Sequence, residues 1–418
     1  MPIYLLLVLI LCAVPLAMAA DGGFPAFDRR AQAGERLNVV FFGASLTWGA
    51  NASDQDLTSY RAVVRERFAQ RYPQAHISCF DAAIGGTGST LGAFRLEHDV
   101  LSHHPDLVFV DFTANDGIYA DDAESLSSYE SILRRLAGAG IPVVQVAFPF
   151  RWDVERAKFP TMKRLHAHQA LATTYGNGWG DAVDRITTGL EQKTYSLTDI
   201  WVADGAHPYD LGYSEFAAAA WDGFETAVRN GAVPHVPAEW VHPATYGHLQ
   251  RYILTSLPTL PTGWRQTRPN RTAINHDWLM SRWLDQLVVV RNRALGPDGK
   301  PLAPAVPVEP LRLSIQASTI ILFGEATATS GHFRVKLDGT VITGLWCQAK
   351  DTDFFEANRW KTGNGHLVIE LARNLDATRT HLVEIEPLFD ATQDQELRIE
   401  SICVAGGPAT VALAPATP

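Results

Sequence analysis

Cysteine is scarce in this chain: there are four among 418 residues, and Cys12 lies in an apolar stretch at the amino terminus. The other three are too few for the disulfide framework that stabilises small secreted proteins. Cys79 is expected to be a buried thiol, while Cys347 and Cys403 lie in one later region, where a disulfide between them stays open. The chain also lacks the Cys and His spacings of metal sites, so neither a metal nor an organic cofactor is expected.

Net positive charge is lacking as well, since 35 Lys and Arg residues stand against 45 Asp and Glu residues, a formal net charge of −10. This balance argues against nucleic acid or an anionic membrane surface as a partner, because both would repel the chain. An apolar content of 46% is typical of a globular protein with a substantial core. A length of 418 residues exceeds one ordinary domain, so two domains are expected.

Long apolar runs are absent apart from residues 1–20, which end in the small-residue sequence Ala17-Met18-Ala19-Ala20. This pattern predicts a signal peptide cleaved near Ala19 or Ala20, and hence a secreted or periplasmic bacterial protein. An uncleaved membrane anchor stays open as the alternative, because the run is barely long enough to span a bilayer. No later segment is apolar enough to cross a membrane, so no stable membrane insertion is expected. The oligomeric state is left unknown.

Residues 36–232 alternate between strand and helix patterns, which predicts a parallel sheet between two layers of helices. Short apolar runs predict strands at 37–42, 77–80, 107–112 and 142–148. A helix with Tyr129, Leu133 and Leu136 on one face follows the third strand, and the capping-box spacing of Ser127 and Glu130 is expected to mark its start. An Ala-rich helix at 214–229 closes this domain.

Residues 240–408 show a different pattern, in which apolar and polar residues alternate with the period of a half-buried strand. The alternating segments are 311–315, 333–337, 367–371 and 382–386. Turn signals such as Asp338-Gly339 separate them, and a proline-rich stretch at 295–310 is expected to be a loop. These features predict a second, accessory domain with a β-sandwich (jelly-roll-like) fold.

Two of four polar blocks in the first domain follow its first two strands. Ser45 lies just after Gly43, where a serine hydroxyl can be exposed at the carboxyl edge of a parallel sheet. The second block, 83–89, contains the glycine-rich turn Gly85-Gly86-Thr87-Gly88. Its backbone N–H groups can stabilise an oxyanion, although its spacing matches no phosphate-binding motif. Each block alone is equally compatible with an ordinary turn.

The other two blocks supply an amide, a carboxylate and an imidazole. Asn115 follows the third strand, and its side-chain NH₂ is a donor suited to an oxyanion hole. Asp204 precedes His207 by three residues on one loop, so its carboxylate can orient the Nδ1–H of the imidazole. The Nε2 atom is then free to take a proton from a serine. A turn with a surface histidine is the alternative reading of this block.

Together these blocks resemble the SGNH (GDSL-like) hydrolase family, whose four block residues are Ser, Gly, Asn and His. Ser45, Gly86, Asn115 and His207 occupy those places in order, and Asp204 matches the acid of the family. The resemblance covers about residues 36 to 225 and implies a three-layer α/β/α domain. It also implies a serine esterase with Ser45, Asp204 and His207 as its triad, and an oxyanion hole made by Ser45, Gly86 and Asn115.

Two positions depart from the family pattern. Ala44 stands where the family has an Asp before the serine, and Asp81 stands where many relatives have Asn. The missing Asp is no triad member, so catalysis is expected to survive. The choice of Gly86 over Gly85 as oxyanion donor rests on the family spacing alone. Asp111, inside the third strand, is expected to be structural.

The substrate is less clearly indicated. Trp48 beside the nucleophile and Trp152 after the fourth strand are expected to bind substrate, as part of an aromatic rim that suits sugar rings or acyl chains. An SGNH domain joined to a β domain is similar to bacterial carbohydrate esterases, which implies an acetylated plant polysaccharide or oligosaccharide as substrate. A lipase-like or lysophospholipase-like carboxylesterase, and a non-catalytic polysaccharide-binding protein, stay open as alternatives.

Overall fold

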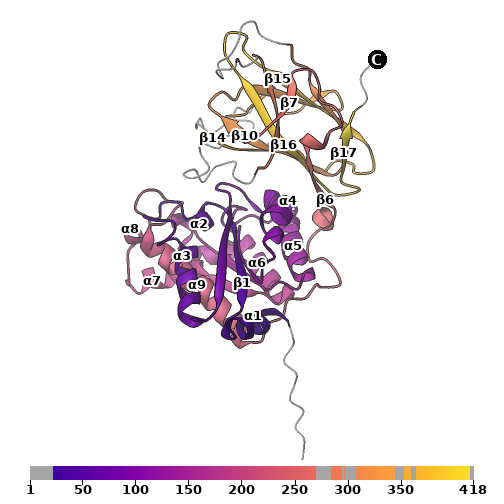
Figure 1. The fold of residues 1–418 in the computed structure, drawn as a ribbon. Coiled ribbons are helices and arrows are strands. Elements are labelled where there is room, and N and C mark those ends of the chain that lie inside the picture. The colour runs from indigo at the N-terminus through magenta and orange to yellow at the C-terminus, as the bar shows by residue number, and fades with distance from the viewer. Residues whose placement is uncertain are drawn as a thin grey trace, which may run out of the picture.

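The computed structural model describes residues 22–269, 284–293, 296, 307–343, 353–358 and 364–414. The predicted signal peptide, Cys347 and most of the proline-rich stretch lie outside these residues. Within them the chain forms an α/β domain and an all-β domain that pack against each other (Figure 1). The expected fold class, a three-layer α/β/α domain followed by a β-sandwich, is confirmed. In the described part of the chain, no helix has the length and apolar character that crossing a membrane requires.

The sheet of the α/β domain is parallel, with strand order β2-β1-β3-β4-β5. Its strands are β1 (Arg36–Gly43), β2 (His76–Ala83), β3 (Leu107–Asp111), β4 (Val143–Ala147) and β5 (Gly178–Asp181). The three central strands β1, β3 and β4 are almost wholly buried, as expected for a parallel sheet covered on both faces. Because β2 and β3 flank β1, the loops that follow these three strands begin side by side.

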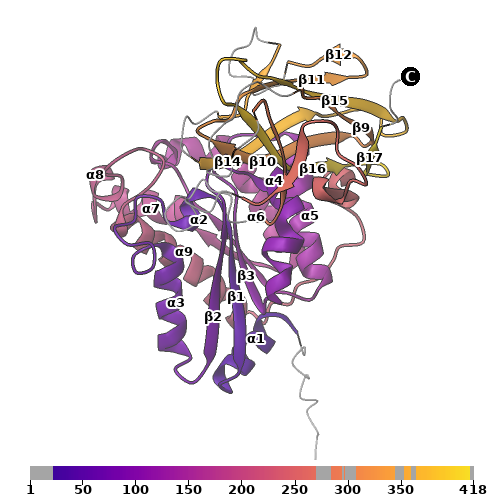
Figure 2. The same cartoon turned by 45° about the horizontal axis from the view of Figure 1, so that its top comes forward.

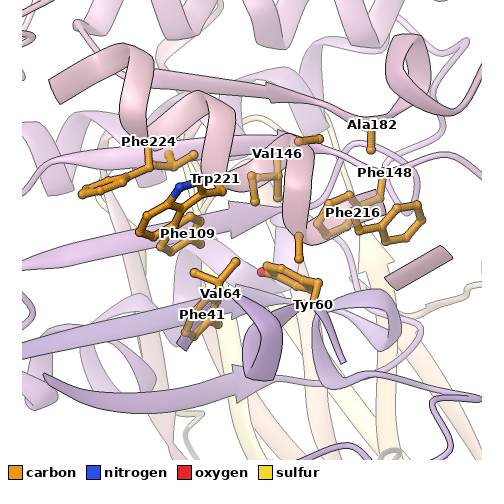
Figure 3. Packing of buried hydrophobic residues seen from close by; sticks show 14 of the residues in the cluster. Phe41, Tyr60, Val64, Phe109, Val146, Phe148, Ala182, Phe216, Trp221 and Phe224 are labelled. Atoms are coloured by element: carbon orange, nitrogen blue, oxygen red, sulfur yellow. The ribbon is translucent and has the colours of Figure 1, made fainter. Parts of the chain in front are cut away.

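Helices cover both faces of this sheet, and alternate residues of each strand pack against opposite layers. Phe41 and Phe109 face one layer, where they meet Phe68, Trp221 and aromatic neighbours (Figure 3). The helices of that layer are α1 (Gly23–Gln32), α3 (Tyr60–Arg71), α7 (Ala182–Glu191) and α9 (Asp210–Arg229). The other layer holds α4 (Ser89–Asp99), α5 (Ala123–Gly138) and α6 (Lys163–Tyr175), and the short helices are α2 (Ser45–Trp48) and α8 (Leu197–Ile200).

The predicted start of α5 was wrong. The helix begins at Ala123, because the Asp122 side chain accepts a hydrogen bond from the Ser125 N–H at 2.9 Å. Ser127 and Glu130, the expected capping pair, lie inside the helix and are buried. Glu130 instead accepts hydrogen bonds from the backbone of the segment that leaves the α/β domain, at 2.8 Å. Two residues that make tertiary contacts were therefore mistaken for a capping box.

The β domain consists of two antiparallel sheets packed face to face, with a buried apolar layer between them. One sheet contains β6 (Leu249–Ile253), β7 (Trp264–Thr267), β8 (Leu287–Arg291), β10 (Thr319–Thr327), β14 (Asn364–Ala372) and β16 (Glu396–Ala405). The other contains β9 (Leu311–Gln316), β11 (His332–Leu337), β12 (Thr340–Val341), β13 (Phe355–Glu356), β15 (His381–Leu388) and β17 (Thr410–Leu413). All four predicted strands of this region are present.

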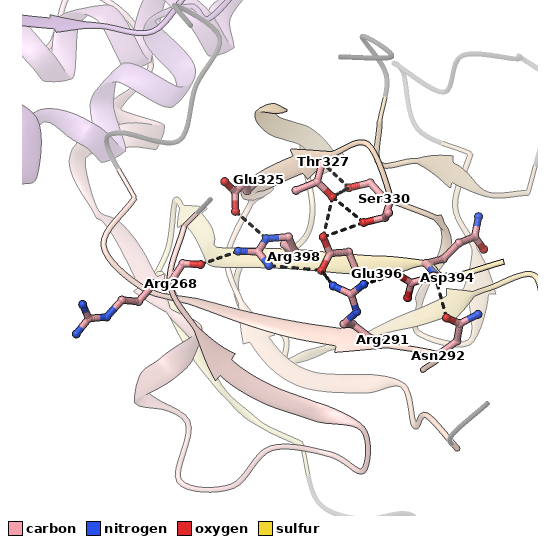
Figure 4. Close-up of polar contacts among 11 residues, drawn as sticks. Arg268, Arg291, Asn292, Glu325, Thr327, Ser330, Asp394, Glu396 and Arg398 are labelled. Carbon is pink, nitrogen blue, oxygen red and sulfur yellow. Dashed lines mark hydrogen bonds and ion pairs between the residues drawn. The ribbon is translucent and has the colours of Figure 1, made fainter. Parts of the chain in front are cut away.

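Charged side chains on the first sheet are buried in pairs. Arg398 Nε donates to Glu325 Oε2 at 2.7 Å, and Arg291 Nη1 donates to Glu396 Oε2 at 2.8 Å (Figure 4). Thr327 Oγ1 donates to the other oxygen of Glu396 at 2.7 Å. Each buried charge thus has a partner, which is the condition under which buried ions are tolerated.

The two domains share one hydrophobic cluster. In β10 and β16, one set of side chains points into the sandwich, while Ile321, Phe323 and Cys403 join the cluster that includes Phe94 and Tyr246. Cys403 is therefore a free buried thiol rather than half of a disulfide, and Cys79 is a half-buried free thiol. Figure 2 shows β10 and β16 next to the helices of the α/β domain. Both faces of these strands are buried, so neither strand shows the alternation that revealed the others.

Candidate active site

Ser45 is the first residue of α2, just after β1, and it is only 4% exposed. The turn between strand and helix is tight at Gly43, where a Cβ would lie 2.2 Å from Thr47 Oγ1 and 2.7 Å from the Asp111 carbonyl oxygen. No larger residue fits this close approach. The loop therefore places Ser45 at the carboxyl edge of the sheet. The helix α2 that it begins lies on the side of the α/β domain that faces the β domain (Figures 1 and 2).

Ser45, His207 and Asp204 form a continuous hydrogen-bonded chain, although 162 residues separate the serine from the histidine. The Ser45 Oγ atom lies 3.0 Å from His207 Nε2, and His207 Nδ1 lies 3.1 Å from Asp204 Oδ2. With the proton on Nδ1, the imidazole donates to the carboxylate and Nε2 accepts from the serine hydroxyl. This is the geometry by which a histidine acts as general base toward a serine nucleophile.

The Asp204 carboxylate is held by its own loop. Its Oδ1 atom accepts hydrogen bonds from the Ala206 and His207 backbone N–H groups, both at 2.7 Å. Partial burial opposes ionisation, but the His207 backbone and side chain together with Asn51 outweigh it and lower the pKa of Asp204 to about 2. The carboxylate is thus charged at neutral pH.

The predicted oxyanion donors Gly86 and Asn115 follow β2 and β3, the two neighbours of the strand that leads to Ser45. Gly86 is exposed with φ +72°, whereas Gly85 is buried. Both Gly86 and Asn115 line a cavity of about 490 Å³. In the described part of the chain, the Asn115 Oδ1 atom has no hydrogen-bond partner, so no neighbour fixes the side-chain amide there.

Asp116 is a site residue that the sequence reasoning missed. Its Oδ1 atom accepts a hydrogen bond from the Ser89 N–H at 2.8 Å and joins the loops after β2 and β3. A Cβ at Gly88 would lie 2.3 Å from the same oxygen, so the glycine-rich block is what permits this contact. Burial is the main cause that raises the pKa of Asp116 to about 6. Its place directly after Asn115 was the available signal.

Further contacts fix α2, the short helix that carries Ser45. Arg61 donates to the Thr47 and Trp48 carbonyl oxygens, at 2.6 and 2.8 Å, and so caps the end of α2. Asp81 lies 3.6 Å from Arg61, which gives this departure from the family pattern a charged partner. Asp111 accepts a hydrogen bond from Thr47 Oγ1 at 3.0 Å beneath the helix, and its burial raises its pKa to about 7.

The two tryptophans expected to bind substrate do not line the cavity. Trp48 is half-buried beside Ser45, and Trp152 is 52% exposed and lies against Gly205 of the triad loop. Side chains of both domains line the cavity instead. From the α/β domain they include Leu91, Asp122 and Ser125, and from the β domain Phe355, Glu356, His366 and Arg373. No group of three metal-ligating side chains occurs within the described ranges.

Comparison with known proteins agrees with this architecture. Residues 41–214 match the model of the GDSL-like lipase/acylhydrolase family. A two-domain esterase active on acetylated mannans, crystallised with mannopentaose, is 20% identical with a TM-score of 0.66, over 93% of this chain and 96% of that one. A second structure described as that two-domain esterase has a TM-score of 0.65 at 20% identity, over 94% and 98% of the two chains.

The acetylxylan esterase Axe2 from Geobacillus stearothermophilus matches more weakly, with a TM-score of 0.39 at 17% identity, over 45% of this chain and 94% of that one. A search of curated proteins finds no significant match. At these identities the solved structures establish the two-domain fold. The residues that match the family model, 41–214, include all four loops of the site. Residues 41–214 of the α/β domain are thus similar to the GDSL-like lipase/acylhydrolase family, and the two-domain fold of the chain is that of a solved esterase.

Proposed function

We propose that this protein is a serine acetylesterase that removes O-acetyl groups from a polysaccharide or oligosaccharide. The observation that carries the proposal is the hydrogen-bonded chain Ser45–His207–Asp204, with contacts of 3.0 and 3.1 Å. The predicted oxyanion donors Gly86 and Asn115 line a cavity to which both domains contribute. The likeness to an esterase active on acetylated mannans, which extends over both domains, supports carbohydrate as the substrate class.

The proposed reaction is two-step acyl transfer. Ser45 Oγ attacks the acetyl carbonyl carbon while His207 Nε2 takes the hydroxyl proton. The backbone N–H groups of Ser45 and Gly86 and the amide of Asn115 stabilise the resulting oxyanion. His207 then protonates the sugar oxygen, which leaves as an alcohol, and the acetyl group stays on the serine. Water, deprotonated by His207, attacks the acetyl-enzyme in the second step and releases acetate.

The lining of the cavity favours a hydroxyl-rich ligand over a long acyl chain. Asp122, Glu356, His366 and Arg373 bring charged or polar groups to its wall. Such groups hydrogen-bond sugar hydroxyls but must lose water to contact a hydrocarbon chain, which costs free energy. Leu91 and Phe355 provide apolar surface for a sugar face. A lipase-like substrate is the second candidate, and chain-length preference distinguishes the two.

The test is acetate release from acetylated mannan, xylan and xyloglucan by the wild type and by Ser45→Ala. We expect release that Ser45→Ala abolishes, because the variant has no nucleophile. Ser102→Ala is the matched control, since Ser102 is exposed and precedes β3, at the opposite edge of the sheet from the site. Faster hydrolysis of p-nitrophenyl decanoate than of p-nitrophenyl acetate, with no release from any polymer, would contradict the carbohydrate assignment.

We further propose that the protein is exported after removal of residues 1–20. The support is the apolar leader that ends in Ala17-Met18-Ala19-Ala20. Amino-terminal sequencing of the protein from the medium or periplasm tests this, and an intact amino terminus in the membrane fraction would favour the anchor instead.

A further inference from the structure

Asn51 contacts the acid of the catalytic triad from the loop that follows the nucleophile. Its Nδ2 atom donates to Asp204 Oδ2 at 2.9 Å and lies 3.4 Å from the His207 carbonyl oxygen. The same Oδ2 atom accepts the His207 Nδ1–H. Asn51 therefore acts on the triad through the carboxylate and touches none of the atoms at which the ester would react.

The backbone of this loop is fixed on both sides of Asn51. The Tyr213 hydroxyl donates to the Ala50 carbonyl oxygen at 2.6 Å, and the Ser53 N–H and hydroxyl donate to Asp210 at 2.8 and 2.6 Å. Tyr213 and Asp210 both belong to the first turns of α9, which begins three residues after His207. The loop after the serine and the helix after the histidine are thus joined directly.

The conformation of Asn51 matches this role. Its φ of +67° lies in the left-handed region, which asparagine tolerates better than most non-glycine residues. Two backbone N–H groups already hold Oδ1 of Asp204, so a donor on Oδ2 stops the carboxylate from rotating away from the imidazole. The Asp204 side chain is 46% exposed, so without this donor water would compete for the same oxygen.

We propose that Asn51 is a positioning residue of this esterase, which holds the Asp204 carboxylate toward His207 and shares its negative charge. The proposal rests on the proposed serine mechanism. Three charged or titratable groups lie around the pair. They are Asp210 on α9, which accepts the Ser53 hydrogen bonds, the Tyr213 hydroxyl, and Arg151, whose Cβ lies against Gly205 between Asp204 and His207. Within the described part of the chain, none of these groups donates a hydrogen bond to Asp204 Oδ2.

Two substitutions separate the side chain from the backbone. Asn51→Gly removes the amide but keeps the left-handed conformation, because glycine adopts it without steric cost. Asn51→Asp keeps the shape and adds a second carboxylate next to Asp204. We expect kcat for p-nitrophenyl acetate to fall about tenfold or more in Asn51→Gly, with KM little changed, because a hydrogen bond to a charged group is lost.

The decisive readout is pH dependence. A more negative environment favours the protonated imidazole, so the acidic limb of kcat/KM moves to higher pH in the order wild type, Asn51→Gly, Asn51→Asp. For Asn51→Asp we expect about half a pH unit or more, the size expected for one added charge a few ångströms away in a solvated site. Gln55→Glu, which adds a charge to the same loop without contacting Asp204, is the matched control and should leave the limb in place.

An NMR titration of the His207 imidazole in the same variants tests the proposal without relying on catalysis. Its pH midpoint should move in the same order as the acidic limb. Identical midpoints in wild type, Asn51→Gly and Asn51→Asp would overturn the role of Asn51, even if activity fell. If the wild type had no esterase activity while the midpoints of the two variants shifted, the proposed function would be refuted and the role of the contact would stand.

Discussion

Asp111 offers a quantitative test of the buried electrostatics beneath α2, the helix that carries Ser45. Its carboxyl is fully buried, Thr47 donates to Oδ2 at 3.0 Å, and Oδ1 has no hydrogen-bond partner within the described residues. Burial is the main cause that raises its pKa from 3.8 to about 7, against the Thr47 hydrogen bond and with a smaller contribution from Asp116. The folded protein therefore keeps a proton on Asp111 that the unfolded chain has lost.

The sign of the pH dependence follows from this proton. Between about pH 4 and pH 7 the folded state binds more protons than the unfolded state, so Asp111 makes stability fall as pH rises through this window. A difference of about three between the two pKa values corresponds to roughly 4 kcal/mol, reached in full above pH 7. Asp111→Asn cannot ionise and keeps an acceptor for Thr47, so it should remove this penalty.

We therefore expect Asp111→Asn to match the wild type in urea stability near pH 4 and to exceed it increasingly up to about pH 8, by at most roughly 4 kcal/mol. Urea unfolding followed by tryptophan fluorescence at several pH values measures this. Asp390→Asn is the control. Hydrogen bonds from the Thr392 backbone and side chain lower the pKa of Asp390, so its carboxylate is charged in both the folded and the unfolded state above the ordinary aspartate pKa range. The effect of Asp390→Asn on stability should therefore not change with pH in the part of the window above that range. Stability curves of wild type and Asp111→Asn that run parallel from pH 4 to pH 9 would refute the reasoning.

Three further predictions concern the oxyanion hole, the domain interface and the packing of α9. Asn115→Ala should lower kcat for p-nitrophenyl acetate by about 10² to 10³ with KM little changed, because one donor to the transition state is lost. An unchanged kcat would remove Asn115 from the oxyanion hole. The hydrogen bond that His98 Nδ1 donates to the Asp99 carboxylate is the main cause that raises the pKa of His98 to about 9. Partial burial opposes this shift, and a hydrogen bond to Asp285 of the β domain adds to it. His98→Gln should therefore lower the thermal midpoint below pH 6.5, and the difference should vanish as pH rises through 9; a constant difference would contradict this. Gly223→Ala should destabilise by about 1 to 3 kcal/mol in urea, because its Cβ would lie 2.7 Å from the Trp179 carbonyl carbon, whereas Ser214→Ala on the exposed face of α9 should not.

Much of the fold was predictable because its elements carry local patterns. Four of the five strands of the parallel sheet are short apolar runs, and the half-exposed strands of the sandwich alternate with period two. The strand β5, which is Gly178-Trp179-Gly180-Asp181, was missed. It lacks an apolar run because Gly178 and Gly180 allow α9 to approach, and a Cβ on Gly180 would lie 2.7 Å from the Ala219 carbonyl oxygen.

The candidate site was only partly predictable. Ser45 could be named because it follows the first strand, and Asp204 and His207 because they lie three residues apart on the loop before the last helix of the domain. The structure brings the three side chains within hydrogen-bond distance. The cavity could not be predicted, because His366 and Arg373 reach its wall through the packing of two domains and not through any local pattern. Nor does any spacing reveal that Asn51 reaches Asp204 across 153 residues.

The hydrophobic cluster shared by the two domains bears on how the chain matures. Cys403 and Ala405 of β16 belong to the same cluster as Phe94 of α4, yet about three hundred residues of synthesis separate them. A chain that emerges from a ribosome or a translocation channel amino terminus first therefore presents α4 and α5 with an uncovered apolar flank until its last strands arrive. Shortening the carboxyl end, or grafting the α/β domain alone onto another protein, would leave that flank in water and favour aggregation. The two domains therefore have to be expressed and engineered as one unit.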